Sequence, residues 1–452
     1  MDENKDLRIM KKLKIVIVGG GSYSWAPKLV RDMMLTETLV EAEYVLLDIK
    51  QRPADLVARF LRKLAHELGV RADFTPTIDR RQAFTGADYV IIAISTGGLD
   101  AMAHDVSIPE AYGIYHTVGD TSGPGGWARF FRNYPVFADL ARDLNRWAPG
   151  APVLNYTNPM TTLTDVLCRL CHAPVIGLCH GLFENLRFLK TYYKVEDEAD
   201  LSVRYAGLNH FFWITAIHYR GRDLLANLKK RLARKGFSDL LRDISPDPMG
   251  FKSHRELATA LYRWTGVMPY LGDRHTCEFF APYITSKKTM RAYKLIRTSM
   301  TERRRMIADR KRDITAMTKG SIPDHFRTRS RETAADIITA HATGRPFVDV
   351  GNVPNAGQIT NLPMGTVVET PVQIDAAGFT PLATGALPER VIGWVEPYAR
   401  VFNVSVQAAL ENDRALALYA LRLDPVCARL DDEQVTELGQ RLLKVHRVRF
   451  AK

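Results

Sequence analysis

The chain lacks long hydrophobic runs. None of its apolar segments approaches the roughly 20 residues that a helix needs to cross a bilayer. Residues 1–14 are polar and charged, without the apolar centre of a signal peptide. Cysteine is scarce, at 5 of 452 residues, which argues against a disulfide-stapled secreted fold and for reduced thiols. The sequence therefore predicts a cytoplasmic protein without a membrane partner.

Acidic residues are also in deficit. The 62 lysines and arginines outnumber 50 acidic residues, which gives a net charge of +12. Much of the excess lies in residues 287–331, but acidic residues interrupt it and no nucleic-acid-binding motif accompanies it. We interpret this region, including Arg303, Arg304 and Arg305, as a solvated helical face or a subunit contact. We predict no nucleic-acid partner, and the positive field suits an anionic small substrate.

The most informative segment that is present joins an apolar run to three glycines. Residues 14–18 read as a buried parallel strand, and glycines directly after such a strand let the backbone approach a pyrophosphate. Asp48, 27 residues after Gly21, ends a second predicted strand, where a carboxylate binds ribose hydroxyls. Ser24 replaces the third glycine of the usual motif, so a turn that binds nothing is the alternative. The pattern predicts an NAD site formed by Gly19, Gly21, Ser22, Tyr23 and Asp48.

Strands and helices alternate up to about residue 200. Predicted strands at residues 14–18, 44–47, 89–93, 153–155 and 175–178 are separated by amphipathic stretches such as 54–68 and 133–146. That alternation predicts an α/β fold with a Rossmann-like, doubly wound parallel sheet. After residue 201 the pattern changes to an alternating aromatic segment, helices and loops. We therefore predict an NAD-binding domain over residues 1–200. A second α+β substrate, metal and oligomerisation domain covers 201–452, as in lactate and malate dehydrogenases.

Chemically active side chains follow two of the predicted strands. Asn158 lies in an Asn-Pro turn after the strand at 153–155, and Cys179 and His180 follow the strand at 175–178. Ligands of open α/β sheets bind at such strand ends. His210 comes 31 residues after Cys179, and a thiolate with one imidazole would leave coordination positions open for a catalytic divalent metal. A haem or zinc site at Cys168 and Cys171 is a weaker alternative, because its other expected features are missing.

Two further segments carry titratable groups. Residues 116–126 form a glycine-rich stretch with Asp120, and residues 272–278 hold five titratable side chains, Asp273 and Arg274 among them. Apolar residues flank the second segment, so its pKa values can be tuned for proton transfer.

Together these motifs resemble glycoside hydrolase family 4, the NAD- and manganese-dependent glycosidases. The resemblance runs from the glycines at 19–21 to residues 385–388. It implies oxidation at C3 of the sugar by NAD, removal of the C2 proton, elimination at C1 and return of the hydride. Cys179 and His210 would bind Mn²⁺, Asp273 would be the C2 base and Asn158 would contact a sugar hydroxyl. Asp120 would hold sugar or metal, Ser95 and Asn155 would contact NAD, and His180 or a metal-bound water would supply a proton.

In the family that the chain resembles, members acting on 6-phosphosugars carry arginines in the loop that corresponds to residues 95–105. This loop has no arginine here, so the resemblance disfavours a phosphosugar. The motifs are most similar to the α-uronidase branch, especially α-galacturonidases. A uronide carboxylate calls for a bidentate donor, for which Arg274 is the first candidate and Arg129 or Arg132 the reserve. α-Glucuronidase, α-galactosidase or α-glucosidase activity and a lactate- or malate-type dehydrogenase are the alternatives. A homodimer or homotetramer is expected.

Overall fold

The structure is a computed structural model of the chain that describes residues 12–240 and 253–450. Most of the polar N-terminal segment used in the signal-peptide prediction lies outside these residues. Within the two described ranges, no helix combines the length and the apolar character that a membrane span requires.

The first half of the chain builds a parallel sheet in the order β3-β2-β1-β4-β5-β6. Its strands are β1 (Lys14–Val18), β2 (Glu43–Leu47), β3 (Asp73–Thr77), β4 (Tyr89–Ile92), β5 (Val153–Asn155) and β6 (Val175–Gly177). The connections reverse direction at β1, which pairs with both β2 and β4. This order confirms the predicted doubly wound sheet and opens a ligand crevice at the carboxyl ends of β1 and β4.

Strand β3 was not predicted, because it contains Pro76 and lacks a continuous apolar run. Proline removes a ladder hydrogen bond and is therefore confined to sheet edges. β3 pairs only with β2 and forms the edge of the parallel part, where this loss is tolerated.

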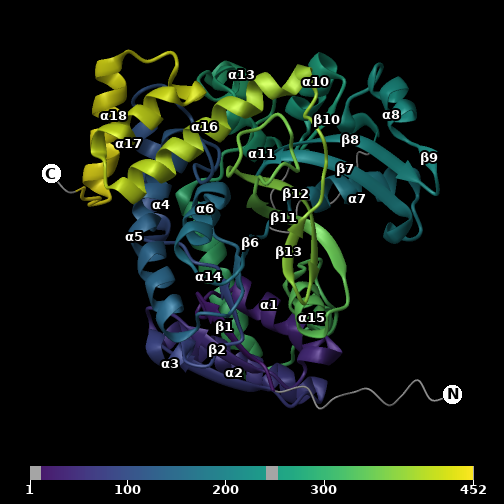
Figure 1. The fold of residues 1–452 in the computed structure, drawn as a ribbon, viewed down its shortest axis with the longest axis vertical. Coiled ribbons are helices and arrows are strands. Elements are labelled where there is room, and N and C mark those ends of the chain that lie inside the picture. Colours follow the sequence, from purple (N-terminus) through teal and green to yellow (C-terminus); the bar gives the residue numbers. More distant parts are fainter. Residues whose placement is uncertain (1–11, 241–252, 451–452) are drawn as a thin grey trace.

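The same sheet continues into the second half of the chain. β6 pairs with β11 (Phe347–Pro354) through Gly177 and Asn352, and the order then runs β12 (Val367–Asp375), β7 (Leu201–Leu208), β8 (Phe211–Tyr219) and β10 (Met268–Pro269). Short strands β9 (Arg222–Asp223) and β13 (Gly378–Pro381) flank β8 and β12. In Figure 1 these later strands lie above the parallel sheet. The sheet thus crosses the predicted boundary at residue 200, and the domain division stays a prediction.

Helices cover the parallel sheet and extend beyond it. α1 (Trp25–Met34) and α2 (Gln51–Leu68) pack on one face, while α5 (Gly123–Trp147) and α6 (Met160–Leu170) contribute to the core cluster on the other. The C-terminal helices α16 (Glu389–Glu411), α17 (Arg414–Leu423) and α18 (Asp432–Val445) join that second cluster. The remaining α-helices are α3 (Arg80–Phe84), α4 (Gly98–Glu110), α7 (Gly181–Tyr193), α8 (Leu225–Leu232), α9 (Phe237–Leu240), α10 (Glu256–Thr265), α11 (Asp273–Thr276), α12 (Ala281–Ile284), α13 (Lys287–Ala292), α14 (Met300–Met317) and α15 (Ala334–Thr343).

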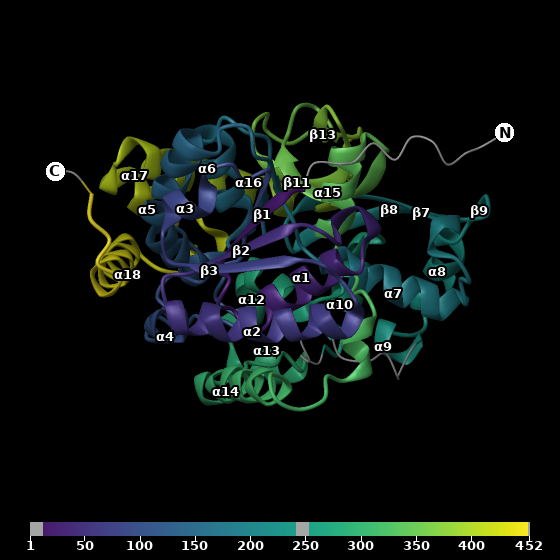
Figure 2. The ribbon, with the colours of Figure 1, turned by 90° about the horizontal axis from the view of Figure 1, so that it is seen from below.

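One late helix returns to the first half of the fold. Figure 2 shows α14 alongside α2, and the Lys63 ammonium donates a hydrogen bond of 3.0 Å to the Met317 carbonyl. Arg304 of α14 also pairs with Asp100 of α4 at 2.8 Å. A segment from the second half therefore lies beside the ligand crevice of the parallel sheet.

Candidate active site

One cavity of about 650 Å³ is lined by residues of both predicted sites. At one end it is lined by the glycine turn after β1, and at the other by residues from the β6 end, the β7–β8 turn and α11. The predicted site residues that line it are Gly19, Gly21, Ser22, Tyr23, Asp48, Ser95, Asp120, Arg129, Asn158, Cys179, His180, His210 and Arg274.

The glycine turn is closely fitted to the strand ends around it. Gly19 has a φ of 98°, and a Cβ there would lie 2.3 Å from the carbonyl oxygen of Ala93. The Gly21 amide donates a 2.9 Å hydrogen bond to the Asp48 carboxylate, which fixes the position of this side chain relative to the turn. Ile49 and Ile78 lie exposed beside Asp48 at the same end of the cavity, where they offer apolar walls to a flat ring.

Asn155 does not line this cavity. Its side-chain amide donates to Thr164 Oγ1 at 3.1 Å, and its Oδ1 accepts from the Thr157 amide at 2.9 Å. These bonds engage the fully buried Asn155 side chain with α6 and with the turn after β5, and its contact with NAD stays a prediction. The residue shapes the turn that carries Asn158.

Cys179 and His210 lie together although 31 residues separate them. The Cys179 sulfur is 3.2 Å from Nε2 of His210. Cys179 follows β6, and His210 stands in the two-residue turn between β7 and β8 with a φ of 81°. Such a backbone costs about 1–3 kcal/mol for a residue other than glycine and is typical of functional positions.

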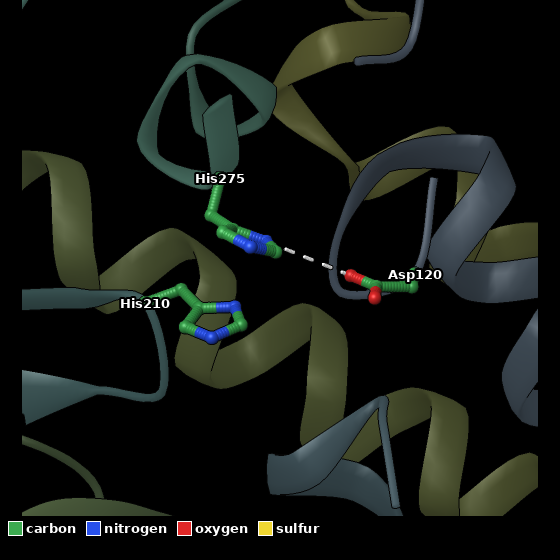
Figure 3. Close-up of side chains that lie close together, drawn as sticks. All are labelled: Asp120, His210 and His275. Carbon is green, nitrogen blue, oxygen red and sulfur yellow. Dashed lines mark ion pairs between the residues drawn. The ribbon is translucent and has the colours of Figure 1, made fainter. Parts of the chain in front are cut away.

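Asp120 and His275 complete a cluster around His210. One ligand atom from each of Asp120, His210 and His275 lies within 4.8 Å of the other two. Figure 3 shows the two imidazoles side by side with the Asp120 carboxylate opposite them, and the distance between His275 Nδ1 and Asp120 Oδ1 is 3.8 Å. The sequence singled out the segment that holds His275 but gave this residue no role; its imidazole directly after Asp273 and Arg274 was the available signal.

The charge states in this cluster suit a cation. Burial lowers the pKa of His275 to about 4 and that of His210 well below its ordinary value, so both imidazoles are neutral at pH 7. Burial alone would raise the pKa of Asp120, but His275 and Arg129 outweigh it and hold that pKa below the ordinary range. Burial raises the pKa of the Cys179 thiol, which a bound metal would deprotonate. These residues offer nitrogen, oxygen and sulfur donors that fit a divalent transition metal.

Asn158 and Arg129 border the same cluster. Asn158 Nδ2 donates to Asp120 Oδ2 at 3.4 Å, and Arg129 Nε donates to the Asn158 carbonyl at 2.9 Å. α5 and the turn after β5 therefore meet near Asp120. The side chains of Asn158 and Arg129 both line the cavity.

Two predicted site residues, Asp273 and Arg132, lie outside the cavity, as do the cysteines of the weaker haem or zinc alternative. The Asp273 carboxylate does not line the cavity, because it accepts 3.0 Å hydrogen bonds from the amides of Leu257 and Ala258 at the start of α10. Arg132 is held by Asp105 through bonds of 2.6 and 2.7 Å, which occupy the fork that a substrate carboxylate would need. Cys168 and Cys171 pack against the core cluster rather than the cavity.

His180 lines the cavity next to residues that the sequence did not connect with it. Its Nδ1 is 3.7 Å from the Glu332 carboxylate, and its ring stacks on Trp25 with centroids 6.1 Å apart. Tyr270 also lines the cavity and stacks on His210 with an interplanar angle of 17°.

A buried carboxylate holds the loop that carries Asp120. Glu278 accepts hydrogen bonds from the amides of Val118 and Gly119 at 2.7 and 2.9 Å and from Thr117 Oγ1 at 2.9 Å. Burial opposes its charge, but His116 at 3.3 Å and these donors keep the pKa of Glu278 below its ordinary value. Glu278 therefore stabilises the site as an ionised acceptor.

Replacing Glu278 with glutamine is expected to lower the free energy of unfolding by about 1.5–3 kcal/mol, because charge-assisted hydrogen bonds are lost in a buried site. Urea denaturation at pH 7 measures this. Glu437→Gln, on the exposed surface of α18, is the matched control and should change stability little. Equal stability of the two variants would contradict the role given to Glu278.

Comparison with known proteins identifies the family. Residues 14–193 match the family 4 glycosyl hydrolase model, and residues 205–427 match the C-terminal domain of the same family. The chain is 32% identical to an α-galacturonidase of Bacillus subtilis, with 94% of this chain and 96% of that protein covered. It is 30% identical to an α-galactosidase of the same organism, with 96% and 98% covered.

Solved structures agree with this. A Bacillus subtilis protein assigned as a glucosidase superposes with a TM-score of 0.87 at 31% identity, covering 96% of this chain and 100% of that one. A 6-phospho-α-glucosidase from gut microorganisms, solved with NAD and Mn²⁺, gives a TM-score of 0.79 at 23% identity, covering 97% and 98%. The fold, the spacing of the site residues and both family matches lead to one conclusion: the chain belongs to family 4 of the glycosyl hydrolases.

Proposed function

We propose that this member of family 4 cleaves α-linked uronides, specifically α-galacturonides, with NAD and a divalent metal. The observation that carries the proposal is the single cavity that joins the Gly19–Asp48 turn to the Cys179–His210 pair and to several arginines. An enzyme that both oxidises and cleaves a sugar needs these elements within reach of one another.

The residues present fit both implied groups. At the glycine turn, a Cβ on Gly19 or Gly21 would lie within 2.8 Å of other protein atoms. The Asp48 carboxylate beside this turn would accept hydrogen bonds from the ribose hydroxyls. At the other end, Cys179 and His210 offer sulfur and nitrogen donors, and Asp120 and His275 add oxygen and nitrogen. Both donor sets share His210, and we propose that it is the central metal ligand.

The chemistry divides between these groups and the protein. When bound, NAD would supply a hydride acceptor for C3, and the metal would supply a Lewis acid that makes the C2 proton more acidic. Asn158 would orient a sugar hydroxyl, since its amide faces the cavity beside Asp120. His180, which lines the cavity, or a metal-bound water would donate a proton to the leaving group.

For the C2 base we propose side chains other than Asp273, whose catalytic role stays a prediction. Asp273 is occupied at the start of α10, so we assign proton removal to the side chains beside His210 that line the cavity, Tyr270 and His275. His275 would accept a proton through a ring nitrogen that does not bind metal, and Tyr270 would accept one only as its phenolate.

The arginines that line the cavity support the proposal that the substrate is an acidic sugar. Arg129 and Arg274 line it, and a guanidinium forms bidentate hydrogen bonds with a carboxylate. The similarity to both an α-galacturonidase and an α-galactosidase leaves the neutral galactoside as the second candidate substrate. The domain division, the homo-oligomeric state and the cytoplasmic location stay predictions.

The test is an incubation with an α-galacturonide, NAD, Mn²⁺ and reductant in D₂O. Sugar release with deuterium at C2 and without accumulation of NADH is expected, because the hydride returns in each turnover. Removal of metal with EDTA should abolish release, and Mn²⁺ should restore it. Release without deuterium would point to direct displacement, and accumulation of NADH without release would identify a dehydrogenase.

A further inference from the structure

The two proposed metal ligands reach the cavity from strands that are not neighbours. Cys179 follows β6 and His210 follows β7, and Figure 1 shows β11 and β12 between these strands. Three steps of about 4.8 Å across a sheet separate two such strands by roughly 14 Å. The Cys179 sulfur nevertheless lies 3.2 Å from His210 Nε2. The relative position of the two strand ends, which β11 and β12 set, therefore decides whether the two donors meet.

The joints on either side of β11 and β12 are short. In the described part of the chain, β6 pairs with β11 only through Gly177 and Asn352, and β12 pairs with β7 only through Glu369 and Gly207. Asn352 and Glu369 also oppose each other in the ladder between β11 and β12. These four residues thus form one row across the sheet. The metal ligands lie two and three residues beyond its two ends.

Buried hydrogen bonds join the side chains of this row. Asn352 Nδ2 donates to the Gly177 carbonyl at 3.4 Å and to Glu369 Oε2 at 3.1 Å. Asn209 Nδ2 donates to the same carboxylate oxygen at 2.8 Å, and all three side chains are fully buried. Because Asn209 directly precedes His210, the Glu369 carboxylate links the end of β6 to the turn that carries this imidazole.

The turn needs such a link. His210 has a φ of 81°, a backbone that persists only where its surroundings hold it. Burial raises the pKa of the Cys179 thiol, Glu369 adds to this, and a hydrogen bond from the Asn209 side chain opposes it, so both residues lie close enough to act on the sulfur. Neither residue lines the cavity, so neither is placed to touch a sugar.

We propose that Glu369 is a positioning residue that, through Asn209, holds His210 at the distance from Cys179 at which both bind one metal ion. The inference rests on the proposed function and deepens it by assigning the geometry of the metal site to the middle of the sheet. Partners that orient metal ligands typically contribute 10–100-fold to metal affinity. A glutamine could still accept from both asparagine amides, whereas an alanine could not.

The first experiment is a Mn²⁺ titration followed by electron paramagnetic resonance. Glu369→Ala and Asn209→Ala should each weaken Mn²⁺ binding about 10–100-fold, and Glu369→Gln should recover most of this loss. Since both residues act along one path, the double alanine variant should lose no more than either single variant. The affinity for NAD, which binds at the other end of the cavity, should stay unchanged and verifies folding.

Co²⁺ in place of Mn²⁺ reports on the sulfur directly, through the charge-transfer band of a cobalt thiolate. At equal Co²⁺ concentration this band should weaken in both alanine variants and return in Glu369→Gln. Asp349→Ala is the matched control, because Asp349 is a largely buried carboxylate on β11 that faces Arg331 at 3.7 Å. It should keep the wild-type Mn²⁺ affinity and the wild-type band.

Wild-type Mn²⁺ affinity in Glu369→Ala would overturn the assignment. So would equal losses of Mn²⁺ and NAD affinity, because these would indicate a general structural role. A wild-type protein that binds no Mn²⁺ would instead refute the proposed metal site, and the inference with it.

Discussion

Replacing Cys179 with alanine should lower kcat/KM for glycoside cleavage by about 10³, because metal-assisted charge stabilisation is worth several kcal/mol. The sulfur lies 3.2 Å from His210 Nε2, and burial keeps the thiol protonated until a cation binds. The variant should therefore also bind Mn²⁺ more weakly. Steady-state kinetics at increasing Mn²⁺ measures both effects.

Cys168→Ala is the matched control, because Cys168 is a free thiol on α6 that packs against the core. It should leave the affinity for Mn²⁺ unchanged. Wild-type metal affinity in Cys179→Ala would remove Cys179 from the metal site and leave Asp120, His210 and His275 as the alternative donor set.

The second large effect is expected for Asp120→Asn, with a loss of about 10² in kcat/KM. Asp120 is the charged member of the cluster, and removing one charge-assisted partner in a buried site costs about 1.5–3 kcal/mol. Because its pKa lies below the ordinary value, wild-type Asp120 stays ionised throughout the range above pH 4. The wild-type rate should then show no loss from Asp120 as the pH falls from 7 to 5.

Kinetics and Mn²⁺ titration of the variant distinguish the two roles that Asp120 can have. A weaker Mn²⁺ affinity indicates a metal ligand, whereas an unchanged Mn²⁺ affinity with a higher KM indicates a contact with the sugar. Asp139→Asn, on the exposed face of α5, controls for the loss of a surface charge. Full activity in Asp120→Asn would contradict both roles.

The parallel half of the fold was predictable because its signals are local. The apolar run of β1, the three glycines and Asp48 lie within 35 residues, and a buried parallel strand leaves few alternatives for such a run. The same holds for β5 and β6, whose predicted strand ends already placed Asn158, Cys179 and His180 at the ligand edge. β3 was not predicted, because edge strands tolerate residues such as Pro76 that interrupt the apolar pattern of a strand.

The orientation of residues 273–275 could not be read in the same way. These three consecutive residues lie in the short helix α11, where each residue points about 100° away from the last. Only the packing of α11 against α10 decides that the Asp273 carboxylate meets the amides of Leu257 and Ala258. Arg274 and His275 consequently face the cavity, although the sequence gave a catalytic role to Asp273 and none to His275.

The sequence alone determined the family, the parallel sheet, the glycine turn with Asp48 and the pairing of Cys179 with His210, because each depends on motifs at the ends of strands. Tertiary structure alone decided that His275 joins Asp120 across 155 residues and that Arg303 turns inward from a basic helix. The physical reason is that a strand's pattern fixes which edge its last residues reach. The side of a helix or loop that becomes buried depends on partners far away in the chain.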